Sequence, residues 1–424
     1  MKKTDLLKLS IAQIGNSMSF MVMFLFLPIY LINNVFTIPG LENTLSYSII
    51  TISFTAGAIT YIFAGYLSDK TRTRFGRRRP FLLLVIPAAT AYIFLGVSFA
   101  SLSIPLTFAF FAIMASIYAI LYRFNYCAYW ALYMDLTKPE ERVTTSIIFN
   151  LFGTIGTVVA LVLTPILQEV ISFFMITLFV GLIFMGTVLF AFFFGPKEDL
   201  EKIQKEDEMG TAPTKITDTL KETISNKNFA KYLFASFFFV LGFQLSVLIL
   251  IPYLEIQAIE LLYLLPCILP IAIFYFIFFN RIAKSWGKLK AFRFIIIFGV
   301  CTIPITMFLG VVGTGVILFI QVLIIISLIL FVVIAILSFQ YAVLMDLTPT
   351  GREATYSGVY LFVIVIPIPI ASALIGPIRD LLSIDVLNFW HGESFSFAII
   401  FLITTIFLAI SYIFLRQIQS TEAK

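Results

Sequence analysis

Twelve long apolar runs, separated by shorter polar segments, constrain this chain more than any other feature of its sequence. A helix needs about 20 mainly apolar residues to cross the hydrocarbon core of a bilayer. Membrane β-strands are shorter and alternate in polarity, and these runs do neither. The sequence therefore predicts twelve transmembrane helices, over residues 9–32, 45–67, 80–100, 105–133, 143–168, 172–195, 230–254, 258–279, 292–312, 314–343, 355–377 and 395–415.

A soluble fold is excluded because the chain has too few polar side chains to cover a surface in water. Sixty per cent of its 424 residues are apolar and 12% are charged, whereas soluble domains have about 25% charged residues. The first apolar run begins too late and is too long for a cleaved signal peptide. One histidine and three scattered cysteines give no metal-binding spacing or disulfide framework, so we expect no cofactor.

Lysine and arginine residues indicate the orientation in the membrane. Nearly all of the 28 lie before the first run, in alternate loops or after the last run. Cytoplasmic loops carry this excess, so we expect a multi-pass protein of the cell membrane with both termini in the cytoplasm. The net charge of +5 then reflects topology, and we expect lipid and a solute as partners but no nucleic acid.

The polar segment 196–229 carries both charge signs and divides the chain near its middle. Such a composition is typical of a solvated linker. We therefore expect an N-terminal six-helix bundle over residues 1–195, a cytoplasmic linker over 196–229 and a C-terminal six-helix bundle over 230–424.

The two halves share short motifs at a constant shift of 211 positions. The stretch Tyr133-Met-Asp-Leu-Thr137 matches Leu344-Met-Asp-Leu-Thr348, and the same shift carries Gly76 onto Gly287. Both matches follow the second or fourth apolar run of their half. Two parallel six-helix repeats, related by an axis along the membrane normal, are a transporter architecture with a solute site near the midplane between the repeats.

The loop over residues 68–81 reads SDKTRTRFGRRRPF, and it resembles the signature loop of the major facilitator superfamily. More specifically, this loop, MDLTKPEER at 134–142 and FNLFGTIG at 149–156 resemble the glycoside-pentoside-hexuronide:cation symporters and their sucrose-transporter-like relatives. The resemblance implies the major facilitator fold, and we expect a functional monomer. It also implies a cytoplasmic gate formed by Asp69, Arg72, Arg74, Gly76, Arg77, Arg78 and Arg79, to which we assign Asp135, Glu141, Arg142, Asp346 and Arg352. A purely structural role for these charges has equal weight.

Arg123 is the strongest single candidate for solute binding. It precedes Asp135 on the fourth run by about 18 Å of helix, which places it near the midplane of a hydrocarbon layer about 30 Å thick. A cation at that depth is costly and is expected to face a wet cavity, where it binds solute hydroxyls or a carboxylate. The alternative is pairing with helix carbonyls or a side chain of the other half.

Other polar or aromatic residues inside the runs complete the predicted solute site. For each of them packing, lipid contact or hydrogen bonding between helices is an alternative of at least equal weight. They are Asn125, Tyr126, Tyr129 and Trp130 beside Arg123, Gln13 and Asn16 in the first run, Gln244 in the seventh, and Gln340 and Tyr341 in the tenth.

Coupling to a cation is the least defined part of the prediction. Sodium-coupled sugar permeases of the family carry two aspartates on the second span, and alignment on the basic loop puts Gly57 and Tyr61 at those positions. Glu255 is the candidate coupling residue if its helix is broken at Pro252. We expect a secondary transporter, not an enzyme, that moves a small polar solute by alternating access, with a sugar or glycoside as the expected solute and a cation, such as a proton, as a candidate for symport.

Four alternatives to that function remain at the level of the sequence. An organic-anion carrier that uses Arg123 and facilitated diffusion without ion coupling are the alternatives within transport. A solute sensor or an intramembrane enzyme would be a different class. The enzyme is disfavoured because the sequence lacks a cluster of nucleophile, base or metal ligands.

Overall fold

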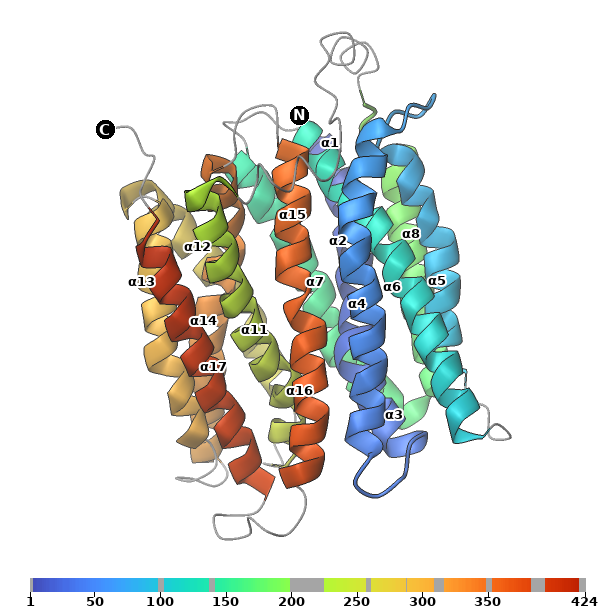
Figure 1. Ribbon diagram of the computed structural model, residues 1–424, viewed down its shortest axis with the longest axis vertical. Coiled ribbons are helices and arrows are strands. Elements are labelled where there is room, and N and C mark those ends of the chain that lie inside the picture. Colours follow the sequence, from blue (N-terminus) through green and yellow to red (C-terminus); the bar gives the residue numbers. More distant parts are fainter. Residues whose placement is uncertain are drawn as a thin grey trace. The chain divides into compact units, whose positions relative to one another are not determined.

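The computed structural model describes residues 3–97, 103–136, 142–198, 225–256, 261–286, 288–308, 316–347, 353–382 and 393–418. These residues are almost entirely helical (Figure 1). They divide into two compact units. The first comprises Met1–Val35, Ile49–Lys227 and Thr348–Pro369, and the second comprises Phe36–Ser48, Asn228–Leu347 and Ile370–Lys424.

The first unit contains the helices of the N-terminal part of the chain. The first rod is built from α1 (Lys3–Ser10), α2 (Ala12–Met21), the π-helical turn η1 (Val22–Phe26) and α3 (Leu27–Asn34). Then follow α4 (Glu42–Lys70), which belongs to this unit from Ile49 on, the 3₁₀ turn η2 (Arg79–Leu84) with α5 (Val85–Phe94), α6 (Ile104–Asp135), α7 (Arg142–Val170) and α8 (Phe173–Phe194). The unit also includes α15 (Glu353–Val365).

The second unit contains the later helices. They are α11 (Lys227–Ile256), α12 (Leu261–Trp286), α13 (Lys288–Thr302) with the 3₁₀ turn η4 (Ile303–Phe308), α14 (Val316–Leu347), α16 (Pro367–Leu382) and α17 (Glu393–Arg416). The range of this unit begins again at Ile370, within α16.

Prolines explain where the rods change their helical geometry. Pro28 has no N–H for the carbonyl four residues earlier, and the π-helical turn Val22–Phe26 lies immediately before it. Pro367 separates α15 from α16 within one rod in the same way. Pro304 lies in the 3₁₀ turn that ends the rod of α13.

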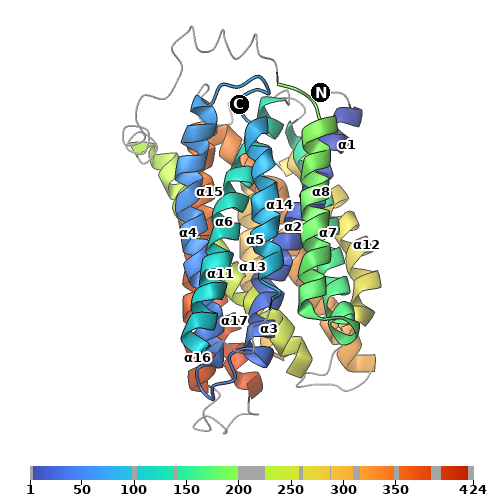
Figure 2. The same ribbon diagram turned by 90° about the vertical axis from the view of Figure 1, so that its right-hand side faces the viewer.

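Close helix packing in the first unit brings α2 against α7 and α8, and α5 against both α6 and α8. Figure 2 shows α5 between α6 and α8. Gly156 of α7 allows the two backbones to approach closely, since a Cβ there would lie 2.3 Å from the backbone oxygen of Ile14 on α2. This packing holds the polar face of α2 beside the neighbouring helices.

A similar cation-to-carbonyl contact occurs in each unit. In the first, the Arg79 guanidinium donates to the backbone oxygen of Phe192 in the last turn of α8. In the second, Arg293 Nε donates to the backbone oxygen of Leu415 in the last turn of α17 at 3.1 Å. Cations stabilise helix C-termini because the last carbonyls lack intrahelical donors. The rod that begins with η2 thus fixes the end of α8, and the rod of α13 fixes the end of α17.

Each of the twelve predicted runs coincides with a helical rod, although the boundaries differ in places. The third run, predicted to reach residue 100, is helical only to Phe94. Seven helices in the described parts of the chain are long and apolar enough to cross a membrane. The condition set for Glu255 as the coupling residue, a helix broken at Pro252, is not met, because α11 continues without interruption to Ile256.

Candidate functional site

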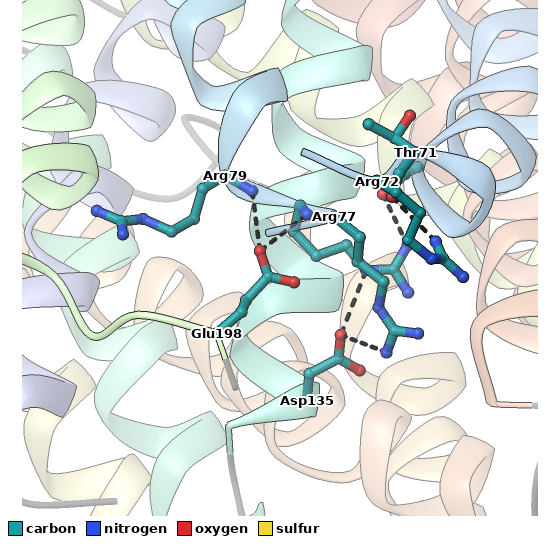
Figure 3. A network of polar contacts seen from close by, with 8 residues as sticks. Thr71, Arg72, Arg77, Arg79, Asp135 and Glu198 are labelled. Carbon is teal, nitrogen blue, oxygen red and sulfur yellow. Dashed lines mark hydrogen bonds and ion pairs between the residues drawn. The ribbon is translucent and has the colours of Figure 1, made fainter. Parts of the chain in front are cut away.

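The loop between α4 and η2 turns sharply at Gly76 and holds a carboxylate from the end of α8. Gly76 has a φ of +103°, which favours glycine. The Glu198 carboxylate accepts hydrogen bonds from the backbone nitrogens of Arg78 at 2.9 Å and Arg79 at 3.2 Å (Figure 3). A Cβ at position 76 would lie only 2.2 Å from Glu198 Oε2. The glycine therefore leaves room for the carboxylate.

Asp135, the last residue of α6, pairs with two arginines of the same loop. Its Oδ2 lies 3.0 Å from Nη2 of Arg77 and 3.3 Å from Nε of Arg78 (Figure 3). Arg78 is only 2% exposed, and its Nη1 also donates to the Ser68 hydroxyl at 2.7 Å. We call Ser68, Gly76, Arg77, Arg78, Arg79, Asp135 and Glu198 the loop network; it links the ends of α4, α6 and α8 to the loop.

Arg79 has a different role from its two neighbours. Its side chain extends away from Asp135 in Figure 3 and reaches the end of α8, where it lies over the Phe192 ring at 5.1 Å. Together with the bond to the Phe192 carbonyl, this contact fixes the C-terminus of α8. Both the backbone and the side chain of Arg79 therefore join the loop to the end of α8.

The other predicted gate residues are not all part of the loop network. Arg72 and Arg74 are exposed; Arg72 donates to the backbone oxygen of Thr71, and Arg74 stacks on Phe75. Asp69, Arg142 and Asp346 lie on α4, α7 and α14, but their side chains fall outside the described part of the structure. Glu141 and Arg352 lie outside the described residues altogether.

Arg123 lies within α6, and aromatic rings from three helices surround it. Its guanidinium lies 5.5 Å from the ring centroid of Phe20 on α2, and 5.2 Å and 5.3 Å from those of Phe54 and Tyr61 on α4. The ring of Tyr122 is 5.1 Å away. Nη1 donates to the Tyr61 hydroxyl at 3.0 Å, and Arg123 is only 4% exposed. These five residues form the Arg123 cluster.

The aromatic rings offset much of the cost of burying the charge. Burial of an ion costs several kcal/mol, and each cation–π contact contributes roughly 0.5–2 kcal/mol. Gly57 lets the arginine stem lie against α4, since a Cβ there would be 3.2 Å from Arg123 Cγ. Gly57 and Tyr61 of α4 thus both lie against Arg123.

Gln13 and Asn16 of α2 contact tyrosines of α6 beside this cluster. Gln13 Nε2 donates to the Tyr126 hydroxyl at 3.2 Å, and the Tyr126 ring stacks on Tyr122. The backbone carbonyl oxygen of Asn16 accepts from the Tyr122 hydroxyl at 3.4 Å. The Asn16 side chain is fully buried, yet its Oδ1 and Nδ2 have no hydrogen-bond partner among the described residues. Buried polar groups are normally paired, so Asn16 requires an explanation.

The remaining predicted residues of α6 face helix neighbours. Asn125 Nδ2 donates to the Leu82 carbonyl oxygen at 3.0 Å, and the Tyr129 hydroxyl donates to the Leu9 carbonyl oxygen at 2.8 Å. Trp130 packs on Phe149 of α7, with the ring centroids 4.2 Å apart. These contacts correspond to the packing alternative for all three residues.

The predicted residues of the second unit are less fully described. Gln244 on α11 has a buried Oε1 without a partner among the described residues. Gln340 on α14 is buried, and its backbone oxygen accepts from the Tyr232 hydroxyl at 2.6 Å. The side chains of Tyr341 and Glu255 fall outside the described part.

Several contacting residues were missed by the sequence prediction. Glu198 counted only as one of many linker acids, although Gly195 and Pro196 before it mark the end of α8. Phe20, Phe54 and Tyr122 are hidden among the 48 phenylalanines and 18 tyrosines. Only their spacing relative to Arg123 could have singled them out, and that requires the register between helices.

Comparison with known proteins establishes the family. The family model of the Major Facilitator Superfamily matches residues 9–372, most of the chain. The chain belongs to this superfamily. The proteins of the superfamily are membrane transporters, so this protein is a multi-pass membrane transporter. The twelve-helix major facilitator fold is thereby confirmed, whereas the narrower resemblance to sugar symporters is not established by these comparisons.

Solved structures of the superfamily show the same fold at low sequence identity. One is a bacterial homologue of the iron transporter ferroportin in an outward-facing state with soaked iron, with a TM-score of 0.67 and 14% identity over 99% of this chain and 100% of that one. Another is a bacterial ferroportin homologue in an outward-facing state, with a TM-score of 0.67 and 13% identity over 98% and 99% of the two chains. No curated protein matches in the sequence search.

Proposed function

We propose that this major facilitator transporter carries a small, neutral, hydroxyl-rich solute, a sugar or glycoside, across the cell membrane by alternating access. The observation that carries the proposal is the side chain of Asn16, fully buried with both polar atoms unpartnered among the described residues. A sugar hydroxyl can both donate and accept, so it satisfies an amide oxygen and an amide nitrogen together. Leaving such groups unpaired costs about 1–3 kcal/mol.

The surroundings of Asn16 support a neutral solute. Tyr122 contacts both the backbone carbonyl oxygen of Asn16 and the Arg123 guanidinium, so the backbone of α2 at position 16 lies beside the aromatic rings of the Arg123 cluster. Gln13 Oε1 on the same helix is also buried without a partner among the described residues. Amides with nearby aromatic faces provide the hydrogen bonds and the apolar contacts that a sugar ring needs.

An organic-anion carrier is the second candidate, because Arg123 supports it. Arg123 Nε is buried and has no partner among the described residues, so a carboxylate could bind there. We rank this candidate second because the faces of the guanidinium are covered by rings and Nη1 already donates to Tyr61.

We do not extend iron transport from the ferroportin homologues to this chain. Identities of 14% and 13% support a shared fold only. In the described residues, no three histidine, cysteine or acidic residues gather in a way that could hold a metal ion.

Counterflow in proteoliposomes tests the proposal and separates the two candidates. Vesicles loaded with an unlabelled solute are diluted into its labelled form, with glucose, lactose and sucrose as neutral probes and glucuronate as the anionic probe. We expect exchange of at least one neutral sugar, reduced at least tenfold by Asn16→Ala. The exposed Asn34 on α3 provides the matched control Asn34→Ala. Exchange of glucuronate without any neutral sugar would replace the first candidate by the second.

A further inference from the structure

We propose that Arg123 is a resident cation that makes a co-transported cation unnecessary, so that this protein equilibrates its solute without ion coupling. The inference rests on the proposed function and specifies its energetics. It follows from three properties of the Arg123 cluster: the permanence of the charge, the way the side chain is held, and the positions of the acidic residues.

The charge of Arg123 is permanent under physiological conditions. A guanidinium does not lose its proton in the working pH range of a protein. Within α6 the residue is only 4% exposed. Any mobile cation that approached this part of the first unit would therefore meet a fixed like charge in surroundings of low dielectric constant, where repulsion is strong.

The side chain is held along its whole length. Its stem lies against Gly57, where any Cβ would be 3.2 Å from Arg123 Cγ. Its Nη1 donates a hydrogen bond to the Tyr61 hydroxyl at 3.0 Å, and rings from α2, α4 and α6 surround the guanidinium. The rings of three helices and the hydrogen bond to Tyr61 thus hold the charge in place. It lies next to Tyr122, whose hydroxyl donates to the backbone oxygen of Asn16.

Acidic residues that could bind a mobile cation lie at the helix ends in the described part of the chain. On α4 and α6 they are Glu42, Asp69 and Asp135, each in the first or last turn. On α7 and α11, Glu169 and Glu255 are next to the last residue. Coupling by sodium or protons needs a carboxylate or another titratable group within the transport path. In the described part of α6, the charged residue in the interior of the helix is Arg123, which is a cation and not a carboxylate.

The test measures whether an ion gradient drives accumulation of the solute. Proteoliposomes are prepared with whichever of glucose, lactose and sucrose shows counterflow, and uptake is followed with inward gradients of sodium, lithium or protons and with choline as the inert cation. We expect initial rates within twofold of one another and a final internal concentration equal to the external one. Accumulation above the external concentration under any gradient would overturn the inference while leaving the proposed function intact.

Failure of the proposed function gives a different result. If none of the three sugars shows counterflow, the proposed substrate class is wrong and the inference falls with it. If counterflow occurs, the gradient experiment on the unaltered protein decides the question of coupling by itself.

Variants of Arg123 test whether its charge is the required feature. We expect Arg123→Ala to lower counterflow at least tenfold and Arg123→Lys to lower it less. Guanidinium chloride at millimolar concentration should restore part of the Arg123→Ala activity, whereas tetramethylammonium should not. Lys8→Ala removes an exposed charge on α1 and serves as the control. Full activity of a correctly folded Arg123→Ala variant without any ion requirement would overturn the inference.

Discussion

The Glu198 carboxylate accepts hydrogen bonds from two successive backbone nitrogens, those of Arg78 and Arg79, at 2.9 Å and 3.2 Å. These nitrogens lie at the start of η2, where the first N–H groups of a helix lack intrahelical acceptors. An acceptor from outside the helix therefore fulfils the function of an N-cap side chain. Glu198, in the segment that follows α8, thereby fixes the beginning of the third rod.

Glu198→Ala should lower the free energy of unfolding by about 1–2 kcal/mol, the usual contribution of a helix cap. Glu198→Gln should cost less, because the amide oxygen can still accept from the same nitrogens. Chemical or thermal unfolding in detergent measures both changes. Lys197→Ala, at the exposed neighbouring residue, should be nearly neutral. An equal loss for Lys197→Ala and Glu198→Ala would contradict the capping role.

Gly76→Ala should lower the free energy of unfolding more than Gly40→Ala does. Both glycines have positive φ, +103° and +79°, but a Cβ at position 40 has no atom within 4 Å. Gly40→Ala therefore measures the backbone strain alone, about 1 kcal/mol. At position 76 the new Cβ also displaces Glu198, so we expect a loss of about 2–3 kcal/mol from the strain and the lost cap together.

A double variant identifies the origin of the additional loss. In a Glu198→Ala background, Gly76→Ala should cost about as much as Gly40→Ala, roughly 1 kcal/mol, because no carboxylate remains to be displaced. Thermal unfolding of the four variants gives this comparison. An unchanged penalty at Gly76 in that background would mean that the backbone, and not Glu198, sets the requirement for glycine.

The helical architecture could be predicted from the sequence because hydrophobic length alone determines it. Twelve runs predicted twelve rods, and the uncertain points fell where local chemistry competes with length. The third run was predicted to reach residue 100 but α5 ends at Phe94, and α11 passes through Pro252, where a break was considered, without interruption. A proline costs one hydrogen bond and a steric clash, but neighbouring helices can compensate for both within a membrane protein.

The candidate sites could be predicted only in part. Arg123, Gln13 and Asn16 were identifiable because a charge or an amide in an apolar run is rare. Their partners were not identifiable, because Phe54 and Tyr61 resemble dozens of other aromatic residues until the register between α4 and α6 is known. Glu198 was hidden for the opposite reason, as one acid in a segment rich in acids.

Asp135 should couple more strongly to Arg78 than to Arg77, although the distance to Arg77 is shorter. The side chain of Arg78 is 2% exposed and that of Arg77 is 16% exposed, so solvent screens the second pair more. Exposed ion pairs contribute about 0–1 kcal/mol. We expect coupling energies below about 1 kcal/mol for Asp135 with Arg77 and of about 1–2 kcal/mol with Arg78.

Double-mutant cycles with alanine at positions 77, 78 and 135 measure these couplings through the free energy of unfolding. Ser68→Ala is the accompanying control, because it removes a neutral partner of the Arg78 guanidinium and leaves the ion pair in place. Equal coupling of Asp135 to both arginines would mean that burial does not control the strength of these pairs.

Tyr61→Phe and Tyr118→Phe form a matched pair that tests the state of Arg123. Both changes remove one buried hydroxyl, from α4 and from α6 respectively, but their hydrogen bonds differ. The Tyr61 hydroxyl accepts from the Arg123 guanidinium at 3.0 Å, whereas the Tyr118 hydroxyl donates to the Ser19 hydroxyl at 3.0 Å. Hydrogen bonds to charged groups contribute about 1.5–3 kcal/mol and neutral ones about 0.5–1.5 kcal/mol. Tyr61→Phe should therefore destabilise the protein more, and it should lower solute exchange because it removes a group that positions Arg123.

Thermal unfolding and counterflow on the same preparations separate the two effects. If Tyr118→Phe impairs exchange as much as Tyr61→Phe at equal stability, then the packing of the tyrosines, and not the position of the charge, governs transport.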